Sequence, residues 1–131
     1  MKIKFANYSL ILILVFLFLF CSNIKKKPNL SLSKYTIDFN VKNRDSIYHD
    51  YLIVSNVGKA ELNIENIQVG CGCTNAVISK RIISPNDTAL LTITYNSRGK
   101  KGFQEEFVII EANTDSIIHL IRVKAEIVKD N

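Results

Sequence analysis

Residues 71–96 read CGCTNAVISKRIISPNDTALLTITYN, and this stretch is the clearest indication of the fold class. Two runs rich in Ile, Val, Leu and Thr, at 74–82 and 88–96, stand on either side of the sequence SPND at 84–87. β-branched residues favour strands, whereas Ser, Pro, Asn and Asp favour turns. The stretch therefore predicts two short strands separated by a turn, with a pair of cysteines directly before the first strand.

The same pattern continues on both sides of this stretch. In KYTIDFNV, at 34–41, apolar and polar residues alternate, as they do in a strand with one buried face. The turn NVGK contains Gly58, which is free to take a positive φ, and SRGKKG at 97–102 is expected to be a glycine-rich hairpin connection. Further strand candidates are 46–56, 60–70, 103–113 and 116–129.

The fold class follows from the number and spacing of these segments. Seven strand candidates fill residues 34–129, and no segment shows a sustained helical period with caps. This pattern predicts an all-β, immunoglobulin-like antiparallel β-sandwich of about seven strands. Two cysteines separated by one residue cannot join opposite sheets, and the chain has no tryptophan, so the disulfide-bridged immunoglobulin domain itself is excluded.

The first 21 residues predict export. Lys2 and Lys4 precede an uninterrupted apolar run, Leu10–Phe20, which is shorter than the roughly 20 residues that a membrane-spanning helix needs. We therefore expect residues 1–21 to form a signal or anchor helix, followed by a polar linker at 22–33. The remaining chain is expected in the cell envelope, in the periplasm or at the outer membrane.

Cys21 directly follows the apolar run and resembles the lipidated cysteine of bacterial lipoprotein signals. Phe20 stands where that signal usually has a small residue, so an uncleaved anchor, or a cysteine that merely ends the run, are the alternatives. Cleavage before Cys21 would remove Lys2 and Lys4, leave 111 of the 131 residues and lower the formal charge from +5 to +3. So small a charge, spread along the chain, predicts no nucleic-acid partner. The N-terminal segment, by contrast, predicts a membrane contact through the anchor.

Several short motifs together resemble the DUF1573 family, exported and often lipid-anchored immunoglobulin-like proteins of Bacteroidetes that are related to ASPM/SPD-2/Hydin domains. The turn at 84–87 has Asn86 where the family has glycine, and Asn tolerates the left-handed conformation. The resemblance spans about residues 34–128 and implies the sandwich fold but no established activity. The motifs are Asn56-Val57-Gly58, Leu62-Asn63-Ile64, Cys71-Gly72-Cys73-Thr74, residues 82–87, and Phe103 to Ile109.

The cysteine pair leaves four alternatives open. In an extended strand, residues i and i+2 lie about 6.6 Å apart, too far for an unstrained disulfide, unless Gly72 lets the chain curl between Cys71 and Cys73. The thiols could serve local packing or a local bond, a reversible redox pair, soft-metal binding such as Cu(I), or pairing between molecules. His49 and His119, each within a strand candidate, are expected to be ordinary strand residues rather than ligands.

No other residues suggest catalysis. The acidic residues, Glu105 and Glu106 among them, are scattered on polar faces or in turns, and no serine has a nucleophile elbow around it. We therefore expect a non-enzymatic envelope module without a cofactor, used for interaction or structural support, with a protein partner of unknown identity. The alternative function is a thiol-redox or Cu(I)-handling protein that uses Cys71 and Cys73.

Overall fold

The computed structural model describes residues 25–128 and contains nine strands in that range. The expected signal or anchor helix, including Cys21, lies outside the described residues. Within them, no helix is long and apolar enough to cross a membrane. The strands are β1 (Leu30–Leu32), β2 (Thr36–Asn43), β3 (Ile47–Asn56), β4 (Leu62–Val69), β5 (Thr74–Ile78), β6 (Ile82–Ile83), β7 (Thr88–Asn96), β8 (Gly102–Ala112) and β9 (Ile118–Val128).

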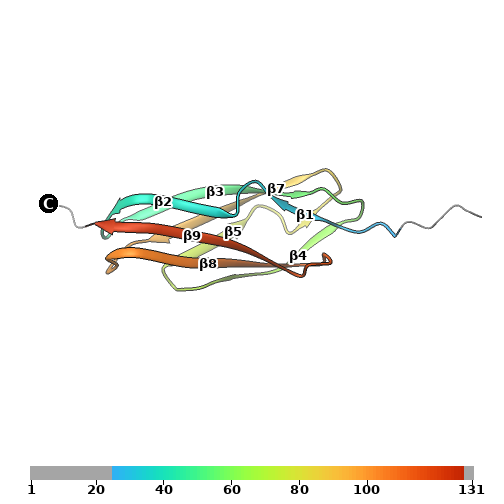
Figure 1. The fold of residues 1–131 in the computed structure, drawn as a ribbon. Helices are drawn as coiled ribbons and strands as arrows, with labels where there is room; N and C mark the ends of the chain where they lie inside the picture. Colours follow the sequence, from blue (N-terminus) through green and yellow to red (C-terminus); the bar gives the residue numbers. More distant parts are fainter. Residues whose placement is uncertain (1–24, 129–131) are drawn as a thin grey trace, which may run out of the picture.

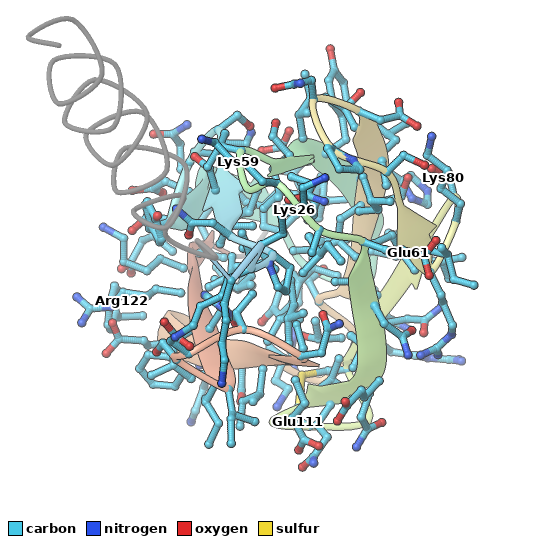
Figure 2. The ribbon with its side chains drawn as sticks, turned by 90° about the vertical axis from the view of Figure 1, so that its right-hand side faces the viewer. Lys26, Lys59, Glu61, Lys80, Glu111 and Arg122 are labelled. Atoms are coloured by element: carbon cyan, nitrogen blue, oxygen red, sulfur yellow. A yellow bond between two sulfur atoms is a disulfide. The ribbon has the colours of Figure 1, made fainter. Side chains whose placement is uncertain are left out.

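The strands form two sheets packed face to face. The four-stranded sheet has the order β1-β3-β7-β5, and the five-stranded sheet has the order β2-β9-β8-β4-β6. The strands run along the long axis of the sandwich, and the described chain enters at one end and leaves at the other (Figure 1). Viewed along that axis, charged side chains such as Lys80, Glu111 and Arg122 point outward (Figure 2). The predicted all-β, immunoglobulin-like sandwich is therefore confirmed.

One strand pair departs from the predicted antiparallel arrangement. Strand β2 pairs in parallel with β9, while the remaining strand pairs within the described residues are antiparallel. The ladder between β2 and β9 shifts register between Asp38 and Val41, next to Asn40 with its positive φ of 55°. Periodicity along a strand reports which face is buried but not the direction of its neighbour, so the sequence could not show this pairing.

Most connections pass from one sheet to the other. Among the described strands, only β8 and β9 are consecutive in sequence and paired in the same sheet. The segment SRGKKG links β7 of one sheet to β8 of the other, so the prediction of a hairpin there was wrong. Its glycines nevertheless have the conformations expected of a tight turn, with φ of 70° at Gly99 and 65° at Gly102.

The sandwich begins earlier in the chain than residue 34. Residues 30–32, which the sequence assigned to a polar linker, form β1 and pair with β3. Leu30 and Leu32 are buried in the core, with Ser31 between them pointing outward. Strand β6 is the second addition to the seven expected strands, and both additions are too short to produce a periodic signal.

The core lies between the two sheets and consists mainly of inward-facing Ile, Leu and Val side chains. Tyr95 and Phe39 add a stacked aromatic pair with ring centroids 5.8 Å apart. The largest fully buried side chains are Tyr95, Ile37, Leu52, Leu62, Ile64, Ile83, Leu91, Ile93, Ile110, Ile121, Val54 and Val108.

A buried asparagine fixes the connection between β3 and β4. The side-chain amide of Asn56 donates to the carbonyl oxygens of Ala60 at 2.8 Å and Ile83 at 2.9 Å. Its side-chain oxygen accepts from the backbone N–H of Gly58 at 3.0 Å and is 3.4 Å from the backbone nitrogen of Asn29. One side chain therefore ties this turn to β6 and to the segment that precedes β1.

Gly58 is needed for close approach rather than for a positive φ. A Cβ atom at this position would lie 2.4 Å from the Asn29 nitrogen and 2.5 Å from the Lys27 carbonyl oxygen. Its φ lies outside the left-handed region, in contrast to the expectation from the sequence. Asn86, by contrast, has a φ of 62° and does adopt the left-handed conformation considered for it.

Candidate functional site

The cysteine pair lies in the crossing from the five-stranded to the four-stranded sheet. Strand β4 ends at Val69 and β5 begins at Thr74, so residues 70–73 form a turn between the sheets. The Gly70 N–H donates to the Phe107 carbonyl oxygen at 3.0 Å, and the Asn96 N–H donates to the Cys73 carbonyl oxygen at 2.7 Å. The turn is therefore fixed to both sheets, toward the end of the sandwich opposite the N-terminal segment (Figure 1).

A disulfide joins Cys71 and Cys73 across this turn. Their Cα atoms are 5.2 Å apart, less than the roughly 6.6 Å of an extended strand, because the chain curls between them. Gly72 has no positive φ, and a Cβ atom there would meet no atom within 4 Å. The curl therefore uses a conformation open to other residues, and not the special freedom of glycine that the sequence suggested.

Thr74 packs directly against both sulfur atoms. Its hydroxyl oxygen lies 3.7 Å from the Cys71 Sγ and 3.9 Å from the Cys73 Sγ, and the residue is buried. The Thr74 N–H donates to the Cys71 carbonyl oxygen at 3.2 Å, and the Cys73 N–H lies 3.2 Å from the Cys71 Sγ. Thr74 thus closes the turn and places a hydroxyl group beside the sulfurs.

Glu106 is a residue of the candidate site that the sequence analysis did not single out. It lies in β8 on the same face as the buried Val108 and Ile110, and its side chain is half-buried rather than on a polar outer face. One carboxylate oxygen and the two sulfur atoms of Cys71 and Cys73 all lie within 4.8 Å of one another. The signal was present in the sequence, because strict alternation back from Ile110 places Glu106 inside the sandwich.

Tyr95 adds a buried hydroxyl group to the same region. The residue pairs with Thr74 across β5 and β7 and is only 1% exposed, and its hydroxyl has no hydrogen-bond partner within the described part of the chain. Burial raises the pKa of Tyr95, and the negative charge of Glu106 raises it further. A carboxylate, two hydroxyl groups and a disulfide are therefore gathered where β4 crosses to β5.

The two histidines considered as ligands, His49 and His119, form other contacts. His49 contacts the Thr94 hydroxyl at 3.0 Å through Nδ1, and His119 contacts the Thr114 hydroxyl at 2.8 Å through Nε2. Within residues 25–128, Cys71, Cys73 and Glu106 are the one group of at least three His, Cys, Asp or Glu residues with converging ligand atoms.

Two cations near the cysteines in sequence are engaged elsewhere. Lys80 forms an ion pair with Asp87. Arg81 donates to the carbonyl oxygens of Ile64 and Glu65, both at 3.1 Å. Neither cation is thus in a position to stabilise a thiolate.

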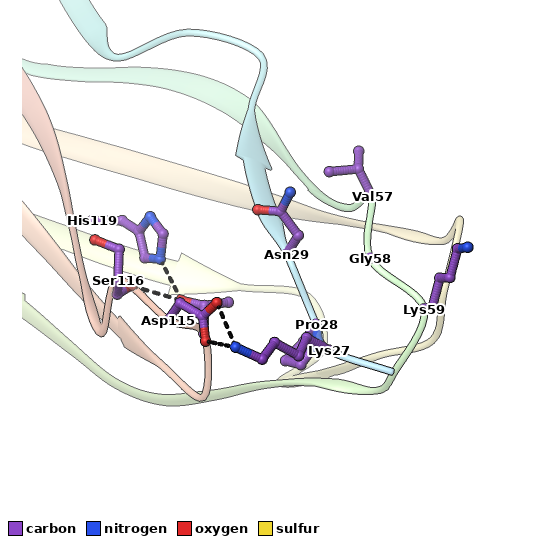
Figure 3. Close-up of a pocket in the computed structure, with 10 residues that line it drawn as sticks. Lys27, Pro28, Asn29, Val57, Gly58, Lys59, Asp115, Ser116 and His119 are labelled. Atoms are coloured by element: carbon purple, nitrogen blue, oxygen red, sulfur yellow. Dashed lines mark hydrogen bonds and ion pairs between the residues drawn. The ribbon is translucent and has the colours of Figure 1, made fainter. Parts of the chain in front are cut away.

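A pocket lies at the other end of the sandwich, where the N-terminal segment meets the hairpin between β8 and β9 (Figure 3). The ammonium group of Lys27 contacts both carboxylate oxygens of Asp115 at 2.9 Å. Burial lowers the pKa of His119, and the backbone contact with Ser116 opposes this shift. The Lys27 and Asp115 charges neutralise each other, and this ion pair joins the N-terminal segment to the hairpin between β8 and β9. We therefore interpret the pocket as structural.

The outer face of the four-stranded sheet carries a group of exposed apolar side chains. Ile53 of β3 lies directly opposite Leu90 of β7, and Tyr51 and Val77 both pair with Thr92 from opposite sides. All four apolar residues are more than 40% exposed. We call Tyr51, Ile53, Val77 and Leu90 the outer apolar patch.

Comparison with protein families and solved structures gives a family and a fold. The model of the family described as "Protein of unknown function (DUF1573)" matches residues 30–127. No curated protein matches the chain.

A structure of a protein of unknown function from Porphyromonas gingivalis is 21% identical, with a TM-score of 0.68. The match covers 76% of this chain and 46% of that one. The ASH/PapD-like domain 7 of human CEP192 is 11% identical, with a TM-score of 0.59, over 80% of this chain and 89% of the domain.

The secreted serine protease VesC of Vibrio cholerae is 18% identical, with a TM-score of 0.59, over 76% of this chain. The match covers 23% of the protease. This chain thus spans less than half the length of the Porphyromonas and Vibrio proteins, and at these identities the likeness is one of fold.

Proposed function

We propose that this chain, which belongs to the DUF1573 family of proteins of unknown function, is a non-catalytic module of the cell envelope. The module is exported, anchored to a membrane through Cys21, and used to bind a protein partner. The fold itself supports a binding or structural module, because the sandwich is similar to the ASH/PapD-like domain of human CEP192.

The N-terminal segment carries this proposal. The Lys27 carbonyl oxygen accepts from the N–H groups of Lys59 at 2.9 Å and Ala60 at 3.3 Å, so this segment is part of the domain. Only residues 22–26 separate it from Cys21, and five extended residues reach about 17 Å at most. An anchor at Cys21 would therefore hold this end of the sandwich at the membrane surface and leave the cysteine turn facing away from it.

Substitution of the anchoring residue tests the proposal. The Cys21→Ala variant of the full chain should lose the lipid and its processing, whereas Ser22→Ala should behave as the parent. Intact mass and membrane fractionation report both properties, and protease added to cells with a permeabilised outer membrane reports export. A Cys21→Ala protein with unchanged size and full membrane retention would instead establish an uncleaved anchor, and protection from the protease would refute export.

The outer apolar patch supports a protein as the partner. Contiguous exposed apolar side chains on a small protein mark interaction surfaces, and this patch is composed of Tyr51, Ile53, Val77 and Leu90. A photocrosslinking residue at position 51, used in the native envelope, should give one discrete adduct that Leu90→Asp abolishes. The matched control is the same residue at position 126 on the outer face of the other sheet. Equal adducts at both positions would refute a specific partner at the patch.

A second candidate function, thiol redox chemistry, is favoured by one observation. The disulfide between Cys71 and Cys73 closes over a single residue, and both cysteines are half-buried rather than sealed in the core. Protein isolated from the native envelope should show a two-proton mass deficit that a mild thiol reductant removes. Alkylation of both thiols without reduction would count against it, and copper retained in the mass and lost in Cys→Ser variants would favour the Cu(I) alternative.

A further inference from the structure

We propose that reduction of the Cys71–Cys73 disulfide creates a zinc site in which the two cysteine thiolates and the Glu106 carboxylate are the ligands. The inference goes beyond the proposed anchored module. It depends on the second candidate function only in that the disulfide must open, and chemical reduction meets that requirement in the test.

The three ligand atoms already converge. The sulfur atoms of Cys71 and Cys73 and one oxygen of Glu106 lie within 4.8 Å of one another, and all three residues are half-buried. Zinc binds thiolate sulfur at about 2.3 Å and carboxylate oxygen at about 2.0–2.2 Å, which places neighbouring ligands of one tetrahedral ion about 3.6–3.8 Å apart. The backbone of the turn is hydrogen-bonded to both sheets, and the two Cα atoms are 5.2 Å apart. Reaching this geometry after the S–S bond opens therefore requires movement of the side chains rather than of the turn.

The electrostatics of the reduced state favour a cation. Opening the disulfide leaves two ionisable thiols beside a carboxylate, and like charges at this separation repel each other. Lys80 and Arg81, the nearest cations in sequence, are bound to Asp87 and to backbone carbonyl groups. A divalent ion would supply the positive charge that these two residues do not.

The ligand set selects zinc over Cu(I). Two thiolates alone suit Cu(I), which accepts low coordination numbers, but a carboxylate is a hard ligand that Zn²⁺ accepts together with thiolates. Three protein ligands leave a fourth position for water. Tyr95, whose buried hydroxyl has no hydrogen-bond partner in the described part of the chain, lies close enough to Glu106 for the carboxylate charge to act on it.

The two steps balance in atoms and electrons. A thiol reductant of the form RSH gives two electrons: the Cys71–Cys73 bond breaks, two RSH molecules become one RSSR disulfide, and their two protons pass to the protein sulfurs. Zn²⁺ then forms two Zn–S bonds and one Zn–O bond, and the two thiol protons leave to solvent. In the oxidised protein neither sulfur is a thiolate, so the disulfide form cannot bind zinc at this site.

Zinc titration of the full chain tests the proposal. A Cys21→Ser background leaves Cys71 and Cys73 as the only thiols, and the protein in detergent is reduced with dithiothreitol and freed of it anaerobically. Zn²⁺ is titrated against a chromophoric chelator. We expect one Zn²⁺ per reduced chain, no binding to the oxidised chain, and at least tenfold weaker binding in Glu106→Gln. Glu105→Gln is the matched control, because Glu105 is the neighbouring carboxylate of β8 and pairs with Arg122 on the outer face; it should change affinity less than twofold.

Cobalt provides a readout of the ligand set itself. Co²⁺ in the reduced parent should show thiolate-to-metal charge transfer and the strong visible bands of a tetrahedral site, and Glu106→Gln should shift those visible bands. Equal zinc affinity in Glu106→Gln and Glu105→Gln would overturn the three-ligand site, as would one Zn²⁺ shared by two chains or no binding by the reduced parent. None of these results would bear on the membrane anchor or the reversible disulfide, which the experiments described above test separately.

Discussion

Gly58 lies so close to Asn29 that a Cβ atom on Gly58 would stand 2.4 Å from the Asn29 backbone nitrogen. This contact joins the turn after β3 to the chain that precedes β1, and it excludes every side chain larger than hydrogen. The conformational freedom of glycine is not the reason, since Gly58 does not adopt a positive φ.

The Gly58→Ala variant should therefore be markedly destabilised. The atoms in the way belong to the backbone of Lys27, Pro28 and Asn29, which cannot move aside as a flexible side chain would. Overpacking of this kind costs about 1–3 kcal/mol, and thermal unfolding measures it. Gly72→Ala is the control, because a Cβ atom there meets nothing within 4 Å; equal melting temperatures for the two variants would show that the close approach is not needed.

Replacement of Asn56 by Ala should also destabilise the turn after β3, because it removes a different set of contacts. The substitution removes the donors to the carbonyl oxygens of Ala60 and Ile83 and leaves those groups without their partner. An unsatisfied buried polar group costs about 1–3 kcal/mol, so we expect a loss in that range or above in urea unfolding. Asn75→Ala, at an exposed position of β5, should change stability by less than about 0.5 kcal/mol.

The double variant Cys71→Ser/Cys73→Ser should remain folded. The disulfide spans a sequence separation of 2, and the loop-entropy contribution of so short a closure is about 1–2 kcal/mol at most. The comparison variant is Leu91→Ala, which removes a buried core side chain and should lower the free energy of unfolding by about 2–5 kcal/mol. Guanidinium unfolding of both variants compares the two losses, and a larger loss in the double cysteine variant would assign the disulfide a structural role.

Tyr95→Phe should be neutral or slightly stabilising. The hydroxyl group of Tyr95 is buried without a partner in the described residues, so its removal relieves a desolvation cost and breaks no hydrogen bond there. Tyr48→Phe is the control, because its hydroxyl donates to the Asn43 carbonyl oxygen at 3.0 Å. Denaturant midpoints should rank Tyr95→Phe at or above the parent and Tyr48→Phe below it; the reverse order would mean that the Tyr95 hydroxyl has a stabilising contact.

Stability should fall as the pH is lowered through the titration range of His119. Burial holds the pKa of His119 below its usual value of 6.5, so the unfolded chain binds this proton more readily than the folded chain. The contribution is fully present above pH 6.5 and is lost as the pH falls through the lower, folded-state pKa. His119→Gln should flatten this part of the stability curve. Parallel curves for the parent and His119→Gln would contradict the assignment.

The fold class could be predicted because alternation and turn residues are local properties of the chain. Strands β7 and β9 show regular burial of every second residue, as the sequence pattern requires. Pairing direction and sheet membership depend on contacts between distant segments, so the parallel neighbour of β2 and the sheet crossing at 97–102 were not visible. Strand β1 was missed because three residues are too few to reveal a period.

The sequence indicated only the part of the candidate site that is continuous along the chain. Cys71, Gly72, Cys73 and Thr74 form one continuous motif, and the structure keeps them in one turn. Glu106 comes from a strand more than thirty residues later, and its position beside the sulfurs depends on the pairing of β4 with β8. The expected lipidation of Cys21 stays a prediction, because that residue lies outside the described part of the chain.

The alternation of consecutive strands between sheets has a consequence for how the chain folds. Strand β2 has β9, the last strand, as its partner in the five-stranded sheet, and β8 with β9 is the one hairpin among the described strands. Loop closure between distant segments is slow, and topologies dominated by it fold late. Strand β2 therefore has no partner in its sheet until the last strand is available, so we expect the five-stranded sheet to remain incomplete in the growing chain, whereas the four-stranded sheet needs no residue beyond Asn96.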